Sequence, residues 1–419
     1  MPNDDAVDDV SDVLRSPTLG TGLSSLGRPC GDALRPDTPP DPGSGLTFGM
    51  TFSGGGFRAT LPALGMVRFL ADAGLLSNLR YVSSVSGGSV ANGILAVKWP
   101  KIRAAGYSSE AVDSEVIDPI VKKISSRSLK GKLILNIWRI VGSKNRTELL
   151  ADAFDDWWFD GHELEHLDPE VRWIINAANI RTGVRFGFER DVLGDYVVGL
   201  ASTAGTGVRV ATAAAASAAV PGAFAKLTLP DDIAFPCGDT RGRPTLLDGG
   251  VYDNTGLEAL DSERYHDVFT ITMNAGGVLT VGSGGGLPIV GDLMRSNSLL
   301  YRQSTSLRTR WMVERFERDR AARDAGEIPG RDARRGVLVA LASDFEPDGG
   351  PLDAFAARYP EHRNWDGKDL AFVPTVFDQL DERLCRSLIY RGWWLAAAGM
   401  ARYHSGDVPL PDLGDGPPR

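Results

Sequence analysis

The chain has 419 residues, of which 42% are hydrophobic and 24% charged, a composition typical of a soluble globular protein. Its formal net charge of −9 argues against general nucleic-acid binding. No run approaches the roughly 20 apolar residues of a membrane span. The three cysteines lie far apart without a CxxC pair, which excludes a disulfide scaffold and a zinc ribbon. This cysteine usage favours a reducing compartment, and the acidic start lacks the features of a secretory signal, so we expect a cytoplasmic protein.

Two tails are predicted on either side of a single domain. Residues 1–45 are acidic and proline-rich and contain no aromatic residue, so they cannot bury enough apolar surface to offset the entropy lost on ordering. We therefore expect a disordered acidic tail there and a second disordered tail at 406–419. Residues 46–405 contain no dividing linker and are predicted to form one domain, in which 100–165 form a helical, basic insertion or lid.

Strand and helix patterns alternate through this domain. Predicted strands cover 46–52, 81–85, 171–178, 184–188, 268–273 and 336–341. Predicted helices cover 59–73, a segment that ends near 97, and parts of 289–325 and 383–403. Strand–loop–helix repetition is typical of an α/β fold whose mostly parallel sheet is covered by helices on both faces.

A glycine-rich loop, SGGGFR at 53–58, lies between the first predicted strand and the first predicted helix. Three consecutive glycines let the backbone approach a ligand and direct several N–H groups into one concavity next to a helix N-terminus. Such a site can bind a phosphate or a developing oxyanion. A nucleotide site is disfavoured because the P-loop lysine and the Rossmann spacing are both absent.

A second loop, SVSGG at 84–88, joins the next strand to the next helix. This is the context of a nucleophile elbow, a strained turn that exposes one serine between small neighbours. Ser86 occupies the central position, and Ser84 stands where the first glycine of that motif is usual. Ser83, Ser84 and Ser89 are rival serines, but none of them is central in the turn.

A serine nucleophile requires a base, and none of the five histidines stands in a convincing glycine-rich context after a strand. The sequence HELEH at 162–166 matches the HExxH zinc pattern. Gly161 and Pro169 leave little room for the necessary helix, however, so we favour a solvated acidic turn over a metal site. The sequence LLDGG at 246–250 instead places Asp248 at a strand end, where a carboxylate can reach an elbow on a neighbouring strand.

In this order, SGGGFR, Ser86 and DGG at 248–250 resemble the motifs of the patatin-like and cytosolic phospholipase A acyl hydrolases. The stretches IINAANIRTGVRFGF at 174–188 and ASAAVPGAF at 216–224 are similar to two further parts of that family. The resemblance spans roughly 46–260. The GGGFR sequence is closer to the cytosolic phospholipase branch, and the DGG sequence is closer to the patatin branch. It implies a three-layer αβα fold.

The resemblance also implies a histidine-free dyad, with Ser86 as nucleophile and Asp248 as general base. Arg58 matches an arginine implicated with the substrate phosphate, and a salt bridge that fixes the loop is the alternative role. No metal or other cofactor is required. The oxyanion hole would be formed by backbone groups of Gly54, Gly55, Gly56 and Gly87.

The function implied is hydrolysis of the fatty-acyl esters of phospholipids or lysophospholipids. Two alternatives stay open at this point. The same dyad could pass the acyl group to another acceptor, or the protein could be a non-catalytic, lipid-binding regulatory protein. The intact serine, aspartate and glycine loop disfavour the non-catalytic alternative.

Residues 119–147 stand out in this acidic chain because they contain eight basic residues and no acidic one. A helix from 129 onward would gather leucine and isoleucine on one side, a pattern close to that of an interfacial amphipathic helix. A core-packed helix with a basic outer face is the alternative. We expect peripheral contact with a membrane through five side chains: Lys130, Lys132, Trp138, Arg139 and Lys144.

Overall fold

The computed structural model describes residues 30, 34–43, 45–129, 145–238, 242–276, 288–347 and 349–418. Its strands are β1 (Thr47–Phe52), β2 (Leu79–Val85), β3 (Arg172–Asn179), β4 (Val184–Phe188), β5 (Val192–Asp195), β6 (Gly199–Ser202), β7 (Leu227–Thr228), β8 (Thr245–Asp248), β9 (Val268–Asn274), β10 (Arg335–Ala340), β11 (Asn364–Trp365) and β12 (Lys368–Asp369). Its α-helices are α2 (Phe57–Asp72), α3 (Gly87–Ala104), α4 (Ser109–Val112), α5 (Asp118–Ser126), α7 (Arg146–Phe154), α8 (Val210–Ser217), α10 (Pro288–Asp324), α11 (Pro351–Arg358) and α12 (Glu382–His404).

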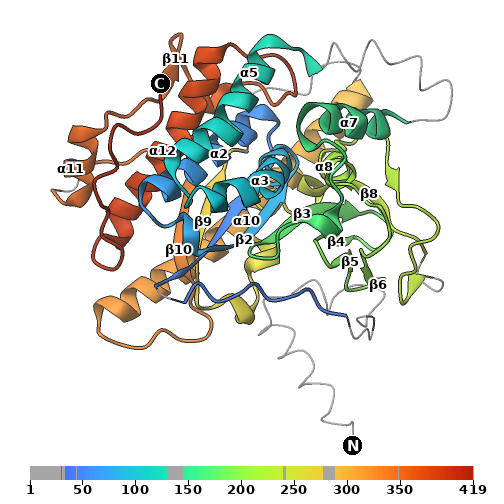
Figure 1. Cartoon of the computed structure of the whole chain (residues 1–419), viewed down its shortest axis with the longest axis horizontal. Coiled ribbons are helices and arrows are strands. Elements are labelled where there is room, and N and C mark those ends of the chain that lie inside the picture. The colour runs from blue at the N-terminus through green and yellow to red at the C-terminus, as the bar shows by residue number, and fades with distance from the viewer. Residues whose placement is uncertain are drawn as a thin grey trace, which may run out of the picture.

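A central sheet has the strand order β10–β9–β1–β2–β3–β4–β5–β6. Strands β10 to β3 in this order are parallel to one another, and β4, β5 and β6 extend the sheet in antiparallel fashion. Helices α2, α3 and α12 cover one face and α10 lies behind the other (Figure 1). The predicted α/β fold with a mostly parallel sheet between helical layers is confirmed.

Helix α12 has a capped N-terminus and a long buried stretch. The Asp381 side chain caps its N-terminus by accepting hydrogen bonds from the N–H groups of Arg383 and Leu384. From Leu388 to Ala401 nearly every residue is buried, mostly against α2, and Trp393 and Trp394 are among the largest buried side chains. This packing fixes α2, and therefore the glycine loop that precedes it, against the rest of the domain.

Strand β8 has an unusual position that brings two distant segments together. Strand β2 pairs with the first part of β3 and ends with Val85 opposite Asn176. Strand β8 runs antiparallel to the last part of β3 and ends with Asp248 opposite Ala177, the next residue. Because β2 and β8 approach each other from opposite directions, the residues that follow Val85 and the carboxylate of Asp248 meet at one place.

The cysteines differ from the sequence-based expectation, because Cys30 and Cys237 form a disulfide. Both flanking backbones are held as well: the Cys30 N–H donates to Tyr196 and the Cys237 N–H donates to Val198. The two residues are 207 positions apart, so their spacing carried no signal of pairing. Disulfides persist mainly in oxidising compartments. The argument from cysteine usage for a reducing compartment was therefore wrong.

The end of the chain also differs from expectation, because residues 406–418 pack on the domain instead of forming a free tail. Val408 and Leu413 are buried in the main core. The Tyr359 hydroxyl donates to the Gly414 carbonyl (2.9 Å), and Arg358 forms an ion pair with Asp412 (2.6 Å). Leucine and valine between the prolines supply the apolar contacts that composition alone did not reveal. At the other end, Arg190 likewise holds part of 34–43 by pairing with Asp37.

Candidate active site

Ser86 lies between β2 and α3 in a strained backbone conformation. Its φ of +50° and ψ of −118° are unusual for a residue with a side chain, as expected for a nucleophile elbow. The next residue must be small, because a β-carbon on Gly87 would overlap the carbonyl oxygen of Gly56. The elbow and the glycine loop are therefore in direct backbone contact.

Ser217, at the end of α8, holds the elbow in place. Its hydroxyl accepts a hydrogen bond from the Ser86 N–H (2.9 Å) and donates one to the Asn176 carbonyl on β3 (2.6 Å). A third contact joins it to the Ser89 hydroxyl (2.9 Å). Ser217 belongs to the ASAAVPGAF stretch noted in the sequence, but its role depends on a pairing across 131 residues that the sequence does not reveal.

Asp248 is buried beside Ser86, with 5% of its surface exposed. Its Oδ1 accepts a hydrogen bond from the Gly250 N–H (2.7 Å), while Oδ2 is buried without a partner of good hydrogen-bond geometry among the described residues. Burial raises the pKa of Asp248 to about 6, although the Ser86 hydroxyl and the Gly250 N–H favour the charged form. A carboxylate with a pKa near 6 is ionised at neutral pH yet basic enough to accept a proton.

The glycine loop presents backbone donors beside the serine. Gly56 has a φ of +59°, and a β-carbon there would lie 2.5 Å from the Val376 carbonyl oxygen, so only glycine fits. The N–H of Gly54 is occupied, because it donates to the Asn254 carbonyl (2.9 Å). This leaves the N–H groups of Gly55, Gly56 and Gly87 as candidate oxyanion donors, one fewer than the four glycines expected.

Arg58, in the first turn of α2, is anchored by two of its three guanidinium nitrogens. Its Nε and Nη1 donate to the carbonyls of Ala275 (3.2 Å) and Val373 (2.6 Å). Nη2 is buried without a partner among the described residues, and it lies 3.4 Å from the point where a Gly55 β-carbon would be. Burial lowers the pKa of Arg58. The salt bridge considered from the sequence is not what anchors this side chain; two backbone carbonyls do so and leave one N–H edge directed at the loop.

Two side chains near this site were not identified from the sequence. Tyr301 of α10 lies beside Asp248, since a β-carbon on Gly250 would be 2.7 Å from its ring and 2.8 Å from Asp248 Oδ1. Burial and the Asp248 charge raise the pKa of Tyr301. Asn254 is fully buried next to Gly54, and both polar atoms of its amide lack partners among the described residues. The only feature of the sequence that could have drawn attention to Asn254 is its position six residues after Asp248. Nothing in the sequence around Tyr301 indicates that it lies at this site.

The histidines interact with residues outside this cluster. His162 and His166 do not share a helical face, because only Leu164–His166 form a single 3-10 turn. Glu163, Glu165 and His166 lie close enough together to hold a cation; both glutamates are half-buried and His166 is exposed. Contacts of the histidine rings include His162 with Phe159, His166 with Glu163, His266 with Asp267, His362 with Ser387 and Tyr390, and His404 with Gly336, Phe269 and Asp407.

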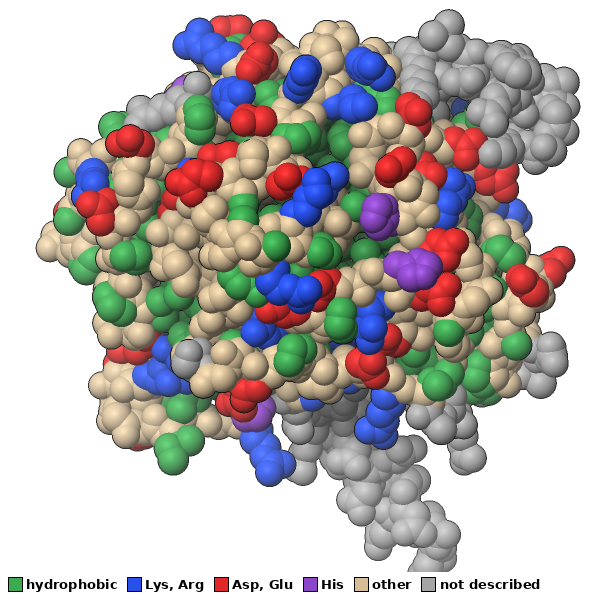
Figure 2. Space-filling model, in the orientation of Figure 1, with side chains coloured by type: hydrophobic (Ala, Val, Ile, Leu, Met, Phe, Trp, Pro, Cys, Tyr) green, Lys and Arg blue, Asp and Glu red, His purple; other side chains and the backbone are tan. Residues whose placement is uncertain are grey.

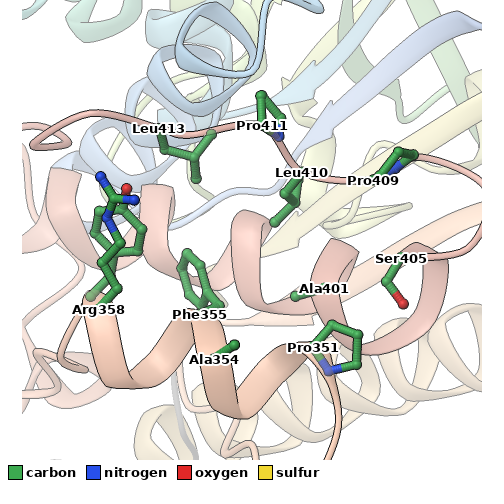
Figure 3. A pocket seen from close by; sticks show the side chains of 11 residues that line it. Pro351, Ala354, Phe355, Arg358, Ala401, Ser405, Pro409, Leu410, Pro411 and Leu413 are labelled. Atoms are coloured by element: carbon green, nitrogen blue, oxygen red, sulfur yellow. The ribbon is translucent and has the colours of Figure 1, made fainter.

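One cavity lies away from the candidate catalytic residues, and the predicted membrane-docking side chains lie outside the described residues. A cavity of about 390 Å³ opens between α11, α12 and residues 409–413, lined by Phe355, Leu410, Leu413 and neighbours (Figure 3). None of the candidate catalytic residues lines it. The five side chains expected to dock on a membrane, from Lys130 to Lys144, lie outside the described residues. Among the described helices, none is long and apolar enough to cross a bilayer.

The family of the chain follows from comparison with known proteins. A model of the patatin-like phospholipases matches residues 50–261, just over half of the chain. The chain therefore belongs to the patatin-like phospholipase family, a family of lipid acyl hydrolases. No curated protein sequence matches it.

The fold is similar to that of a solved phospholipase structure. Human GIVD cytosolic phospholipase A2, in complex with methyl γ-linolenyl fluorophosphonate, aligns with a TM-score of 0.50 at 13% identity. The alignment covers 88% of this chain and 59% of the human one, so the chain spans about three-fifths of that structure. VipD from Legionella pneumophila aligns with a TM-score of 0.37 at 13% identity, covering 86% of this chain and 68% of VipD.

Proposed function

We propose that the protein is a serine acyl hydrolase that cleaves fatty-acyl esters of phospholipids or lysophospholipids. The observation that carries this proposal is the end-to-end meeting of β2 and β8, which sets Ser86 in its strained turn beside the buried carboxylate of Asp248. Membership of the patatin-like phospholipase family supports a lipid ester as the substrate.

In the proposed reaction, Ser86 Oγ attacks the ester carbonyl while Asp248 Oδ2 takes the hydroxyl proton. The negative charge that develops on the carbonyl oxygen is stabilised by the N–H groups of Gly55, Gly56 and Gly87. Each such donor lowers the barrier by roughly 3 kcal/mol. Collapse of the tetrahedral intermediate breaks the ester bond, and Asp248 returns the proton to the departing alcohol.

The acyl-enzyme is then hydrolysed in the same site. A water molecule loses a proton to Asp248 as it attacks the acyl carbonyl, and the fatty acid leaves when Ser86 regains its proton. Acyl transfer is the same sequence with an alcohol in place of water. A non-catalytic, lipid-binding role gives no account of the strained Ser86 or of the pKa of Asp248, and we do not favour it.

Isotope labelling separates hydrolysis from transfer. In water enriched in oxygen-18, we expect the fatty acid released from phospholipid to carry one labelled oxygen, because water resolves the acyl-enzyme. Mass spectrometry of the products checks this, with and without a lysophospholipid as a competing acceptor. Exclusive formation of acylated acceptor without labelled fatty acid would identify a transferase.

Arg58 is proposed to recognise the substrate phosphate through its Nη2, which has no partner among the described residues. We expect Arg58→Ala to reduce kcat/KM for a phospholipid at least about tenfold more than for a neutral nitrophenyl ester, since a guanidinium bond to phosphate is worth about 1.5–3 kcal/mol. Arg80→Ala is the matched control, because Arg80 is also buried and bound to backbone carbonyls but lies at the other end of β2. Equal losses on both substrates would assign Arg58 to anchoring the loop.

A further inference from the structure

We infer that the outer face of α10, together with an apolar rim around the active site, docks on the surface of an anionic phospholipid bilayer. This inference rests on the proposed function and names the surface through which the enzyme would reach its substrate. The central part of the surface, here named the α10 stripe, comprises Leu300, Leu307 and Trp311.

The α10 stripe lies along one side of the helix. Residues spaced by seven and eleven positions fall within about 40° of one another on an α-helix. Leu300 is 70% exposed, Leu307 54% and Trp311 40%. On the inward side of the same helix, Met312 and Phe316 are buried in a cluster with Leu257. The exposed apolar side chains are therefore additional to those that the helix needs for packing on the domain.

The same helix connects the stripe to the catalytic residues. Leu300 directly precedes Tyr301, whose ring contacts the Asp248–Gly250 turn. Two further exposed apolar side chains, Val251 and Val376, flank the site and form the apolar rim. Val251 directly follows Gly250. Val376 lies against the end of the glycine loop, where its carbonyl accepts the Phe57 N–H (3.0 Å). A lipid leaving a bilayer that touches this rim would have a short path to Ser86.

The charge of this part of α10 fits an anionic surface. Between 293 and 313 the helix contains four arginines and no acidic residue, although the chain as a whole carries a net charge of −9. Arg308 is engaged by Glu258 (2.7 Å). Arg310, three residues after Leu307, is exposed beside the α10 stripe, and Glu314 on the same side is paired with Arg318 (2.5 Å). Basic residues near an anionic membrane are attracted to its surface charge. Exposed leucine and tryptophan beside arginine are the residues expected at such an interface.

The side of the molecule that carries α2, α3 and α12 is the one drawn in Figure 2. On the side that carries α2, α3 and α12, acidic and basic side chains are intermingled and the apolar ones are scattered (Figure 2). Scattered apolar side chains are normal on a protein surface, whereas apolar side chains gathered around a site are typical of an interaction surface.

The test measures binding to vesicles separately from catalysis. Full-length protein carrying Ser86→Ala is sedimented with vesicles of phosphatidylcholine and phosphatidylglycerol, so that hydrolysis cannot alter the membrane. Adding Leu300→Ser, Leu307→Ser and Trp311→Ser together should lower the partition coefficient at least about tenfold, because three apolar side chains no longer enter the interface. Ile328→Ser is the matched control: Ile328 is 95% exposed in the loop beyond α10 and should leave binding unchanged.

Two further measurements define the mode of contact. Replacing Arg310 with Glu should weaken binding to the anionic vesicles and leave the weaker binding to pure phosphatidylcholine unchanged. Brominated lipid should quench the fluorescence of the protein less after Trp311→Phe. Melting temperatures of all variants should lie close to that of the parent, since exposed substitutions have small effects on stability.

The inference is overturned if the triple variant binds vesicles as well as its parent does. It is equally overturned if only the reversal of Lys130, Lys132, Arg139 and Lys144 to Glu abolishes binding. A third contrary outcome is that the triple variant changes the oligomeric state, measured by light scattering, but not vesicle binding, since the stripe would then join two copies. Failure of the proposed function would be distinguishable, because wild-type protein would bind vesicles but release no fatty acid.

Discussion

Replacement of Ser86 by alanine is expected to reduce ester hydrolysis at least about 1,000-fold, on phospholipids and on soluble esters alike, because no acyl-enzyme can form without the hydroxyl. The folded state should be retained. The Ser86 hydroxyl is not needed for packing, and the N–H that Ser217 holds is a backbone group present in the variant as well. Fatty-acid release and nitrophenyl ester turnover measure the loss.

Ser89→Ala is the matched control for this prediction. Ser89 lies three residues further on, in the first turn of α3, and its hydroxyl contacts Ser84 (3.1 Å) and Ser217 (2.9 Å). We expect the control to lose far less activity than the Ser86 variant, because its role is limited to supporting Ser217. Substantial turnover by Ser86→Ala protein would exclude Ser86 as the nucleophile.

Asp248→Asn is expected to abolish activity to a similar extent and at the same time to stabilise the protein at neutral pH. The pKa of Asp248 is about 6 in the folded protein against a reference value of 3.8. Above pH 6 the folded state holds a desolvated charge that the unfolded state would expose to water. Removing this charge should raise the free energy of unfolding by up to about 3 kcal/mol, the equivalent of the pKa difference.

The extra stability of the Asp248→Asn variant should depend on pH. As the pH falls from about 6 toward 3.8, the wild-type carboxyl becomes protonated in the folded state before it does so in the unfolded state, and the wild type recovers the stability. The advantage of the Asn variant should therefore be full at pH 7.5 and nearly absent at pH 4. Denaturant unfolding at both pH values checks this, and a variant that is less stable at pH 7.5 would contradict it.

The same pKa should govern catalysis in the wild type. Because the base acts in its ionised form, kcat/KM for a soluble ester should rise with pH through an apparent pKa near 6 and then level off. The plateau should persist to higher pH, since the proposed dyad contains no histidine that must be protonated.

The sequence predicted the main strands and helices and the candidate dyad for related reasons. Elements such as β1, β2 and the middle of α12 are buried almost entirely, and their apolar residues follow recognisable strand and helix patterns. Ser86 and Asp248 stand in small-residue turns at strand ends, a context typical of functional side chains. The antiparallel strands β5, β6 and β7 have two to four residues each, too short for a periodic pattern, and the sequence did not predict them. Of β8, it predicted only the end at Asp248.

What the sequence could not reveal depends on contacts between distant residues. The hydrogen bond of Ser217 to the elbow, the Cys30–Cys237 bond and the position of Tyr301 against Gly250 each join segments separated by at least 50 positions. The occupied N–H of Gly54 is a similar case, because only the folded chain brings the Asn254 carbonyl to it. These contacts decide which predicted site residues are available for chemistry.

Reaction with a fluorophosphonate ester tests the central claim most directly, because such a reagent forms a stable adduct only with an activated serine. Peptide mapping by mass spectrometry should find one adduct, on Ser86. Its rate of formation should rise through pH 6 and fall at least about 1,000-fold in Asp248→Asn protein. An adduct on another serine, or labelling of Ser86 at an undiminished rate without the Asp248 carboxylate, would contradict the proposed dyad.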